Sequence, residues 1–380
     1  MAKNNLPLAY IELSKNNLIH NIKQFRKLAK KGTRFSVVVK GNAYGHGQNE
    51  VVKILEPYAD YFQVNSVFEL KLLRKVSKKK TFVFGYVGIT DLLLAQKLGC
   101  ILSIFSIEQL REVDKIAKKL KIKQDIHLPV DAYLGREGFL LQELPKVFAK
   151  IKKCKFIRLS GIYAHFANIE DTPNFSHAQK QIKEYQNILR IAEEYGFDNL
   201  QTHISATSGL LAYEKSKGVH PLVRLGIGVY GIWPSEYLKS LYKKTNFKLR
   251  PVLAWKTRIA QIKILPKGHT IGYGLTYQTK KETKVAVVPQ GYADGLDRGF
   301  SNNGHVLIAG SRCKILGRVM MNMVVVDINH LKDVNIEDEV VILGRQGKEE
   351  ITAEEMAKLT NTVNYEIITR TSSLLPRVII

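Results

Sequence analysis

From residue 14 to about residue 230, amphipathic helical segments alternate with short apolar runs, and this pattern predicts a parallel sheet covered by helices. Eight such runs fall in this stretch, and eight strands in about 200 to 250 residues indicate a (β/α)8 barrel, or TIM barrel. Beyond residue 240 the apolar runs lie close together between glycine turns, which predicts a compact, mainly β domain. The predicted fold class is therefore α/β, with an N-terminal (β/α)8 TIM barrel over residues 1–240 and a C-terminal, mainly β domain over residues 241–380.

The eight expected barrel strands follow one another along the sequence with helical segments between them. They are RFSVVVK (34–40), YFQVNS (61–66), TFVFGY (81–86), ILSIFS (101–106), DIHLPV (125–130), LSGIYAHF (159–166), LQTHIS (200–205) and VRLGIGVYG (223–231). The polar segment 235–250 is the expected boundary, and the first residues of the chain are candidates for the β domain. The β-rich runs of that domain are PVLAWKTRIAQIKIL, TKVAVVPQGYADGL, HVLIAGSRCKILGRV, MVVVDI and DEVVILG, with a late helix expected at 352–360.

The composition is that of an ordinary globular protein, with 45% hydrophobic and 24% charged residues. No stretch approaches about 18 uninterrupted apolar residues, so no membrane span is expected. The first apolar segment is broken by Glu12 and lacks a small-residue cleavage site, so we expect a cytoplasmic protein. Cys100, Cys154 and Cys313 are odd in number and widely spaced, which predicts free thiols rather than disulfides or a metal site.

The formal charge of +24 raises the question of a nucleic-acid partner. Basic runs occur at 75–80, 118–123 and 150–155. Each lies between a helical pattern and the next apolar run, where solvated helix ends are expected, and none is interleaved with aromatic residues. We therefore expect no nucleic-acid partner, while a small anionic ligand is compatible with this charge.

Polar residues gather at the ends of the expected barrel strands, where the active sites of such barrels lie. They are Lys40, Asn65, Arg136, His165, His203 and Ser205. A lysine at the end of the first strand points into the mouth of the barrel. Partial desolvation there lowers the pKa of its amine and makes it available as a nucleophile or base.

The segment VVVKGNAYGHG around Lys40 resembles the cofactor attachment motif of the alanine racemases, which use pyridoxal 5'-phosphate. The resemblance continues through YAHF, HISATSG, RLGIGVYG, IGYGLTY, GYADG and GRVMMNM, in the family's order and spacing. It extends from about Tyr10 to the end of the sequence. It implies an isomerase that supplies D-alanine for the bacterial cell wall and a homodimer whose active sites are shared between subunits.

The resemblance also assigns the cofactor-binding residues. It implies that Lys40 forms the internal aldimine and that Arg224 faces the ring nitrogen, supported by His165 and His203. Because an arginine does not readily give up its proton, the ring nitrogen stays unprotonated and the ring is a weaker electron sink, which suits racemisation. The residues implied at the phosphate are Tyr44, Ser205, Gly226, Ile227 and Tyr365.

Racemisation needs a base on each face of the α-carbon. The resemblance assigns Lys40 to one face and Tyr273, from the β domain of the other subunit, to the opposite face. An unperturbed tyrosine is a poor base at neutral pH, so nearby positive charge must stabilise the phenolate, and His165 is the implied tuning residue. Arg136 is implied near the substrate carboxylate and the catalytic phenol, and Tyr292 and the backbone of Met321 as the remaining walls of the substrate entry and carboxylate site.

The sequence departs from the family pattern near the substrate. Pro129 stands where the family often has a lysine modified by carbon dioxide, and DAYLGR replaces DTGMGR. Asn322 replaces the usual aspartate, and Met320 stands where cysteine or serine is commoner. These departures leave a broader or serine-preferring racemase as the alternative to an alanine racemase.

Two other functions, each from a different class of protein, fit these residues less well. A barrel-fold amino-acid decarboxylase would place an acidic residue at the ring nitrogen and a glycine triplet at the phosphate. A non-enzymatic pyridoxal-phosphate carrier would lack the β domain that contains Tyr273. We therefore predict a two-base racemase that interconverts L-alanine and D-alanine.

Overall fold

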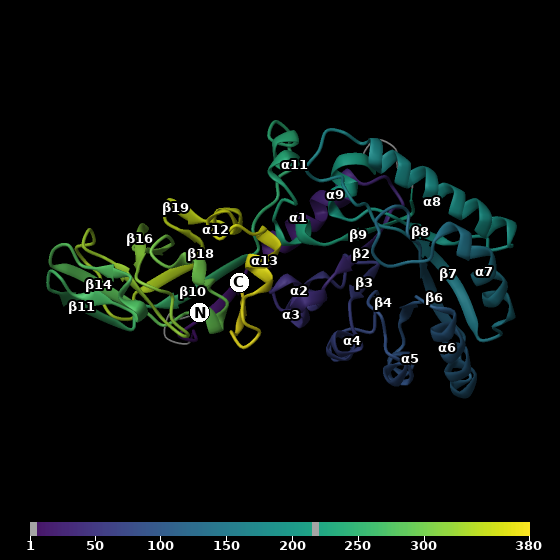
Figure 1. Cartoon of the computed structure of the whole chain (residues 1–380), viewed down its shortest axis with the longest axis horizontal. Helices are drawn as coiled ribbons and strands as arrows, with labels where there is room; N and C mark the ends of the chain where they lie inside the picture. The colour runs from purple at the N-terminus through teal and green to yellow at the C-terminus, as the bar shows by residue number, and fades with distance from the viewer. Residues whose placement is uncertain (1–5, 215–219) are drawn as a thin grey trace. The chain divides into compact units, whose positions relative to one another are not determined.

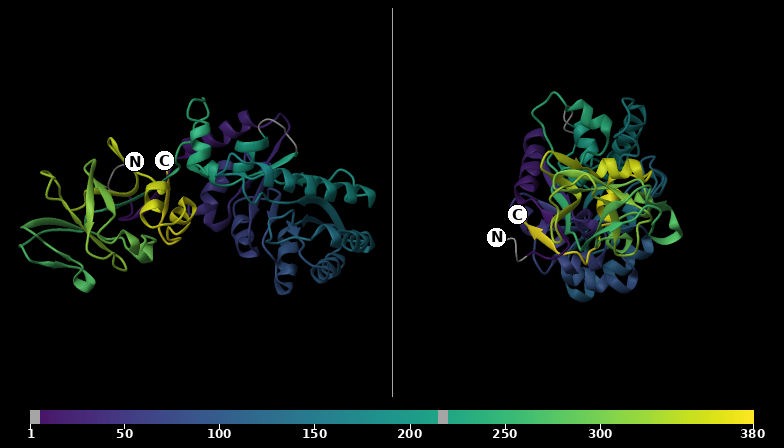
Figure 2. Two further views of the ribbon diagram at one scale, coloured as in Figure 1. Left: turned by 45° about the horizontal axis from the view of Figure 1, so that its top comes forward. Right: turned by 90° about the vertical axis from the view of Figure 1, so that its left-hand side faces the viewer.

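The computed structural model describes residues 6–214 and 220–380, and the contacts of the chain divide it into two compact units. The barrel unit consists of residues 18–41 and 51–250. The β unit consists of residues 1–17, 42–50 and 251–380, so the chain passes between the units four times. Figures 1 and 2 show the strands and helices of each unit.

Eight parallel strands form the barrel, which confirms the predicted fold class (Figure 1). Their order around the sheet is β8-β7-β6-β5-β4-β3-β2-β9. A bridge between Ala206 and Arg224 joins the segment after β8 to β9, and the Arg224 amide donates to the Ser205 carbonyl across it. The strands are β2 (Arg34–Val38), β3 (Tyr61–Val64), β4 (Thr81–Val83), β5 (Ile101–Ser103), β6 (Gln124–Pro129), β7 (Ile157–Tyr163), β8 (Gln201–His203) and β9 (Leu222–Leu225).

Helices follow the strands, and side-chain caps fix where several of them begin. Ser66 caps α4 by accepting from the Glu69 amide at 3.2 Å, while Glu69 accepts in return from the Asn65 amide. The helices are α1 (Lys15–Leu28), α3 (Gln48–Leu55), α4 (Val67–Leu73), α5 (Leu92–Leu98), α6 (Ile107–Leu120), α7 (Leu144–Lys153), α8 (Ser176–Glu194), α9 (Thr207–Gly209) and α11 (Glu236–Leu241), with shorter turns at Ile89–Asp91, Leu141–Glu143, Leu210–Glu214 and η5 (Ile227–Tyr230). None of the helices in residues 6–214 and 220–380 combines the length and apolarity that a membrane crossing requires.

The barrel unit extends to Arg250 because buried Asn21 binds the chain there. The Asn21 side chain accepts from the Arg250 amide at 2.9 Å and donates to the Arg250 carbonyl at 2.8 Å. Phe247 packs edge-on against Phe25 with 5.2 Å between ring centroids. These contacts keep the polar segment 235–250 with the barrel.

The β unit is built on a sheet of ten strands in the order β11-β14-β17-β16-β15-β18-β10-β1-β20, with β19 paired to β18. The early strand β1 pairs antiparallel with β10 and parallel with β20, so residues near the start of the sequence belong to this sheet. The strands are β1 (Tyr10–Leu13), β10 (Leu253–Arg258), β11 (Gln261–Leu265), β14 (Thr283–Val288), β15 (His305–Ile308), β16 (Ser311–Leu316), β17 (Val324–Asp327), β18 (Glu339–Gln346), β19 (Glu349–Ile351) and β20 (Arg377–Ile379), beside a separate pair β12 (Thr270–Ile271) and β13 (Tyr277–Gln278).

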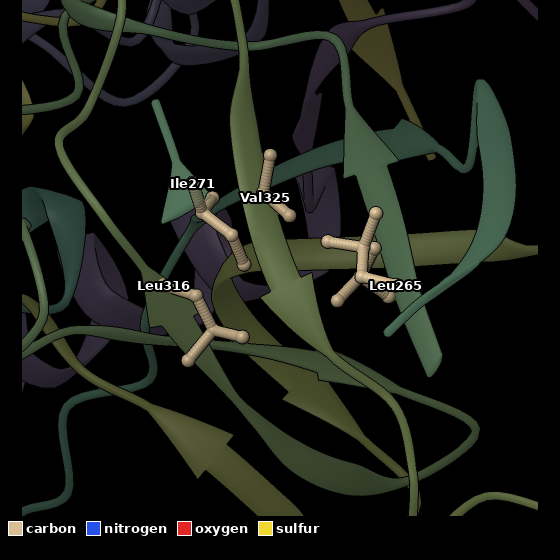
Figure 3. Packing of buried hydrophobic residues seen from close by; sticks show 5 residues of the cluster. Leu265, Ile271, Leu316 and Val325 are labelled. Carbon is tan, nitrogen blue, oxygen red and sulfur yellow. The ribbon is translucent and has the colours of Figure 1, made fainter. Parts of the chain in front are cut away.

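Apolar side chains from several of these strands meet in the core of the β unit. Leu265, Ile271, Val285, Leu316 and Val325 form one buried cluster, and Figure 3 shows the labelled members facing one another. The alternation of buried and half-exposed residues along β10 matches a sheet with one covered face. Two helices complete the unit, α12 (Ala353–Leu359) near the expected 352–360 and α13 (Asn364–Thr369).

The short helix α2 (Lys40–Tyr44) turns in the left-handed sense after its first residue. Gly41, Asn42, Ala43 and Tyr44 have φ between +53° and +61°, and Gly45 follows at +82°. Such angles cost about 1–2 kcal/mol for each residue with a Cβ, so other contacts must hold the turn. The Asn42 side chain accepts from the Gln48 amide at 2.9 Å, and the Gly45 carbonyl accepts from Arg377 Nη2 at 2.7 Å.

Gly45 is the position where this turn depends most on glycine, so its replacement is expected to destabilise the protein strongly. In Gly45→Ala the added Cβ would lie 1.9 Å from the Ile368 carbonyl oxygen, in addition to the strain of a positive φ. Gly41→Ala is the matched control, because φ is also positive there but no atom lies within 4 Å of the added Cβ. We expect Gly41→Ala to lower the free energy of unfolding by about 1–2 kcal/mol and Gly45→Ala by at least about 2 kcal/mol more. Equal losses in urea unfolding would contradict this account.

Candidate active site

A cavity of about 570 Å³ opens at the carboxyl ends of the barrel strands. This volume is within the usual range for small-molecule sites. Five residues singled out in the sequence line it, namely Lys40, Asn65, Arg136, His165 and Arg224. The barrel therefore brings these side chains together from β2, the end of β3, the loop after β6, the end of β7 and β9.

Lys40 follows the buried strand β2 and faces this cavity. Protein atoms around its amine remove solvent, and this desolvation lowers the pKa of Lys40, with a further lowering from Arg136. Glu69 acts in the opposite direction, and its carboxylate accepts from the Gly41 amide at 2.7 Å. A lysine with a lowered pKa has a larger fraction of neutral amine, which is the nucleophilic form.

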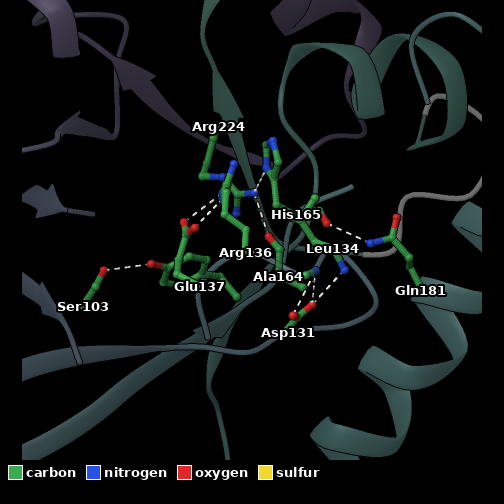
Figure 4. Close-up of polar contacts among 11 residues, drawn as sticks. Ser103, Asp131, Leu134, Arg136, Glu137, Ala164, His165, Gln181 and Arg224 are labelled. Carbon is green, nitrogen blue, oxygen red and sulfur yellow. Dashed lines mark hydrogen bonds and ion pairs between the residues drawn. The ribbon is translucent and has the colours of Figure 1, made fainter. Parts of the chain in front are cut away.

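The guanidinium of Arg224 is 3% exposed and is surrounded by acceptors from two neighbouring strand ends. Its Nη2 donates to the carbonyls of Ala164 and Ile204 at 2.8 and 2.9 Å and to His165 Nδ1 at 2.8 Å. Its Nη1 donates to His203 Nδ1 and, at 3.2 Å, to the His203 carbonyl. Figure 4 shows Arg224 with Ala164 and His165. These bonds compensate the desolvation of a buried cation.

The bond from Arg224 sets the tautomers of two buried histidines. Because His203 Nδ1 accepts from Arg224, the neutral His203 ring carries its proton on Nε2 and donates it to His127 Nδ1, 2.9 Å away. His127 then carries its proton on Nε2, which finds no acceptor among the described residues. Burial, reinforced by the charge of Arg224, lowers the pKa of His127 to about 3 and that of His203 well below its ordinary value.

His165 is also neutral in this arrangement. Burial lowers its pKa to about 3, and the charges of Arg224, Arg136 and Lys40 act in the same direction. We expected His165 to be hydrogen bonded towards Arg224, and this bond is present, so His165 is a neutral partner of a positive charge. In the barrel unit that charge lies on Arg224, to which His165 is hydrogen bonded.

Ser205, Gly226 and Ile227 lie where β8 and β9 end, next to Arg224. The Ser205 hydroxyl is fully buried and has no hydrogen-bond partner among the described residues. Close packing surrounds it, since a Cβ on Gly209 would lie 2.5 Å from the Ser205 Oγ. Gly226 directly precedes η5, whose first residue is Ile227. A buried hydroxyl without a partner is a donor that fits a phosphate oxygen, so these residues fit the cofactor that the sequence implies.

The remaining predicted residues belong to the β unit, where they form two groups. Tyr44 and Tyr365 lie together with 6.3 Å between ring centroids, and burial raises the pKa of Tyr44 to about 12. Tyr273, Tyr292 and Met321 line a second cavity, of about 630 Å³. Their side chains are exposed, by 73%, 46% and 56% respectively, so this surface of the β unit is an open aromatic and methionine face.

Phe84, Glu137 and Tyr163 are among the residues that line the barrel cavity but were not singled out in the sequence. Phe84 stacks on Tyr163 with ring centroids 4.4 Å apart, and Tyr163 stacks on His203 at 5.2 Å. Glu137 pairs with Arg136 through two hydrogen bonds. Phe84 and Tyr163 stand in apolar runs that also suit a core, whereas the charged pair of Arg136 and Glu137 could have been noticed in the sequence.

Comparison with known proteins gives consistent matches along nearly the entire chain. Residues 13–234 match the alanine racemase N-terminal domain and residues 252–379 the alanine racemase C-terminal domain. Alanine racemase of Leptospira interrogans is 33% identical over 98% of this chain and 96% of its own length. The structure of alanine racemase from Bacillus anthracis with bound L-Ala-P has a TM-score of 0.92 and 31% identity, covering 99% of this chain and 95% of that one. Histidine racemase from Leuconostoc mesenteroides subsp. sake has a TM-score of 0.87 and 25% identity over 99% of each chain.

The neutral state of buried His127 predicts a specific pH dependence of stability. Its folded pKa of about 3 is below the unfolded value, so the unfolded chain binds one more proton in mildly acidic solution and stability falls as pH falls. Between about pH 5.5 and about pH 4.5 this one group removes about 1.4 kcal/mol per pH unit. His127→Gln should reduce the pH slope of the free energy of unfolding by that amount, whatever its effect on absolute stability. The same replacement at exposed His269 controls for loss of an imidazole, and an unchanged slope in His127→Gln would refute a neutral His127.

Proposed function

This chain belongs to the alanine racemase family and is an amino-acid racemase, and we propose that it interconverts L-alanine and D-alanine with pyridoxal phosphate held at Lys40. When bound, pyridoxal phosphate supplies an electron-accepting ring that acidifies the α-hydrogen of an attached amino acid. The observation that carries the proposal is the placement of Lys40, with a lowered pKa, in the same cavity as the guanidinium of Arg224.

The proposed cofactor contacts use groups that are already oriented. Lys40 would hold the cofactor covalently, and Arg224 would donate to its ring nitrogen while remaining a permanent cation. The unpartnered Ser205 hydroxyl supports a phosphate position after β8 and β9, to which family resemblance adds the backbone of Gly226 and Ile227. Family resemblance adds the hydroxyls of Tyr44 and Tyr365 to the proposed phosphate ligands.

The proposed chemistry moves a proton between two bases. The Lys40 amine would take or return the proton on one face of the α-carbon, and the Tyr273 phenol would act on the other. Arg136 would bind the substrate carboxylate through its guanidinium, while Tyr292 and the Met321 backbone would line the access route. Exposed Tyr273 belongs to the β unit and Lys40 to the barrel unit.

A broader or serine-preferring racemase remains the alternative substrate preference. Pro129, Met320 and Asn322 depart from the family pattern, and the last two line the cavity of the β unit. The structural likeness to a histidine racemase indicates that this fold also serves a larger amino acid. We propose alanine as the main substrate because relatives along nearly the full length of the chain are named alanine racemase.

We further propose that the reaction takes place in the cytoplasm and supplies D-alanine for peptidoglycan. Cys100, Cys154 and Cys313 are free thiols, which is compatible with a reducing compartment. Burial raises the pKa of Cys100 and Cys313 to about 12, so these thiols are unreactive.

Purified protein supplied with pyridoxal phosphate is expected to convert L-alanine into D-alanine, as resolved by chiral chromatography across a panel that includes serine and histidine. Borohydride reduction should fix the cofactor irreversibly, abolish activity and place the label on the peptide that contains Lys40. Recovery of the label on a different lysine would overturn the Lys40 assignment. Faster turnover of serine than of alanine would favour the alternative substrate preference.

The positions of the two proposed bases lead us to propose a homodimer. Lys40 and Tyr273 lie in different units of the chain, and family resemblance pairs them across a subunit interface. An isologous dimer would build each active site from the barrel unit of one protomer and the β unit of its partner. The exposed Tyr273, Tyr292 and Met321 of the β unit support such an interface.

Mixing two inactive variants tests the shared site. When Lys40→Ala and Tyr273→Phe proteins are unfolded and refolded together at equal concentration, about half of the dimers should be mixed. Each mixed dimer would contain one site with both bases and one with neither, so activity should return to roughly a quarter of the wild-type value. Each variant refolded alone is the control. No recovery, although mass spectrometry detects mixed dimers, would confine the mechanism to one chain.

A further inference from the structure

Glu137 places a carboxylate in the barrel cavity and directs it at Arg136. Arg136 Nη2 donates to Glu137 Oε1 at 2.8 Å, and Arg136 Nε donates to Glu137 Oε2, so the contact is bidentate (Figure 4). The two side chains are 55% and 37% exposed, and both line the cavity with Lys40 and Arg224. Two parallel bonds fix the plane of a guanidinium, which a single contact does not.

The loop that carries this pair is held rigidly. Its ends are tied by backbone bonds, from the Asp131 amide to the Phe139 carbonyl and from the Phe139 amide to the Pro129 carbonyl, both 3.0 Å. The Asp131 carboxylate accepts from the amides of Leu134 at 2.8 Å and Gly135 at 2.9 Å, as Figure 4 shows. These bonds fix the backbone from which the Arg136 and Glu137 side chains extend.

A buried glutamine fastens the same loop to the barrel. Gln181 is fully buried, and its Nε2 donates to the Ala132 carbonyl at 2.7 Å and to the His165 carbonyl at 3.0 Å. Gly138 allows the close return of the chain, since a Cβ there would lie 2.7 Å from the Asp131 amide nitrogen. The loop thus keeps a fixed position relative to His165 in the cavity.

Basic side chains outnumber acidic ones among the described residues that line the cavity. Lys40, Arg136 and Arg224 contribute cations, and Glu137 is the one acidic side chain among the described residues that line it. Pro129, at the end of β6 beneath the loop, cannot carry an anionic modification of the kind that lysine accepts. The negative charge beside Arg136 therefore comes from the loop itself.

We propose that Glu137 is a positioning and specificity-determining residue, which orients Arg136 and occupies its fork so that amino acids with an acidic side chain are disfavoured. The proposal rests on the proposed function, in which the substrate binds beside Arg136. Glu137 bonds to the Nε and Nη2 donors of Arg136 and compensates its charge, so the Nη1 side remains for the substrate's α-carboxylate and little is left for a second carboxylate. Without the Glu137 charge, the free donors of Arg136 would bind such a carboxylate.

The test compares aspartate with asparagine, which have the same shape and differ in charge. In Glu137→Gln the ratio of kcat/KM for L-aspartate to that for L-asparagine should rise about tenfold or more over wild type. Where turnover is slow, the ratio of their inhibition constants against alanine racemisation is the measure. A variant that shows no gained preference for aspartate overturns the proposal.

Two further variants distinguish an effect of the negative charge at Glu137 from an effect of side-chain packing. Glu137→Asp keeps the charge, so its ratio should remain within about twofold of wild type even if alanine turnover falls. Glu112→Gln removes a surface charge of the barrel unit that pairs with Lys115, and it should leave the ratio unchanged. A rise in ratio of equal size in Glu137→Asp or Glu112→Gln would also overturn the proposal.

The experiment distinguishes this inference from the function on which it rests. If wild-type protein does not racemise any amino acid of the panel, the proposed function fails. If wild-type protein racemises alanine but Glu137→Gln retains the wild-type ratio, only the role of Glu137 fails. Because an exposed ion pair contributes little to stability, Glu137→Gln should unfold close to the wild-type temperature, and this measurement accompanies the assay.

Discussion

The buried guanidinium of Arg224 is the constraint on which the barrel and its site both depend. Arg224 is 3% exposed, and a cation buried to this extent needs hydrogen-bond acceptors around it. The ends of β7 and β8 supply these acceptors. The Arg224 backbone completes the bridge that joins β9 to the segment after β8. Arg224 also lies opposite Ser36 of β2, the strand that precedes Lys40. Arg224 therefore contacts both the strand before Lys40 and the strand ends that carry His165 and His203.

The same guanidinium decides where positive charge resides in the cavity. Burial, reinforced by the charge of Arg224, lowers the pKa values of His127, His165 and His203, so these imidazoles contribute hydrogen bonds without charge. Cationic charge is concentrated on side chains that face the cavity, where an anionic ligand can reach it.

The eight barrel strands could be predicted because each is a short apolar run bounded by helical pattern, and strand ends could be predicted to carry polar side chains. Lys40 and His165 were found in this way, whereas Arg224 was implied only by the family resemblance. The left-handed turn was not predicted, because its handedness depends on contacts such as that between Gly45 and Arg377, far apart in sequence. The contact between Tyr44 and Tyr365 could not be predicted from the local sequence pattern either, because the two residues are far apart in sequence. Glu137 was missed because a carboxylate in an exposed loop has no periodicity to set it apart.

The route of the chain between its two units has a consequence for the order in which the molecule can be completed. Residues 42–50, directly after Lys40, belong to the β unit, and Gly45 is bonded to Thr371, 326 residues later. A nascent chain emerges from the ribosome in sequence order, and its early segments fold before later ones exist. The barrel strands are therefore all synthesised while the turn beside Lys40 still lacks its partners. That turn can reach its final form only after translation has passed Arg377, so the segment beside Lys40 is among the last parts of the protein to mature.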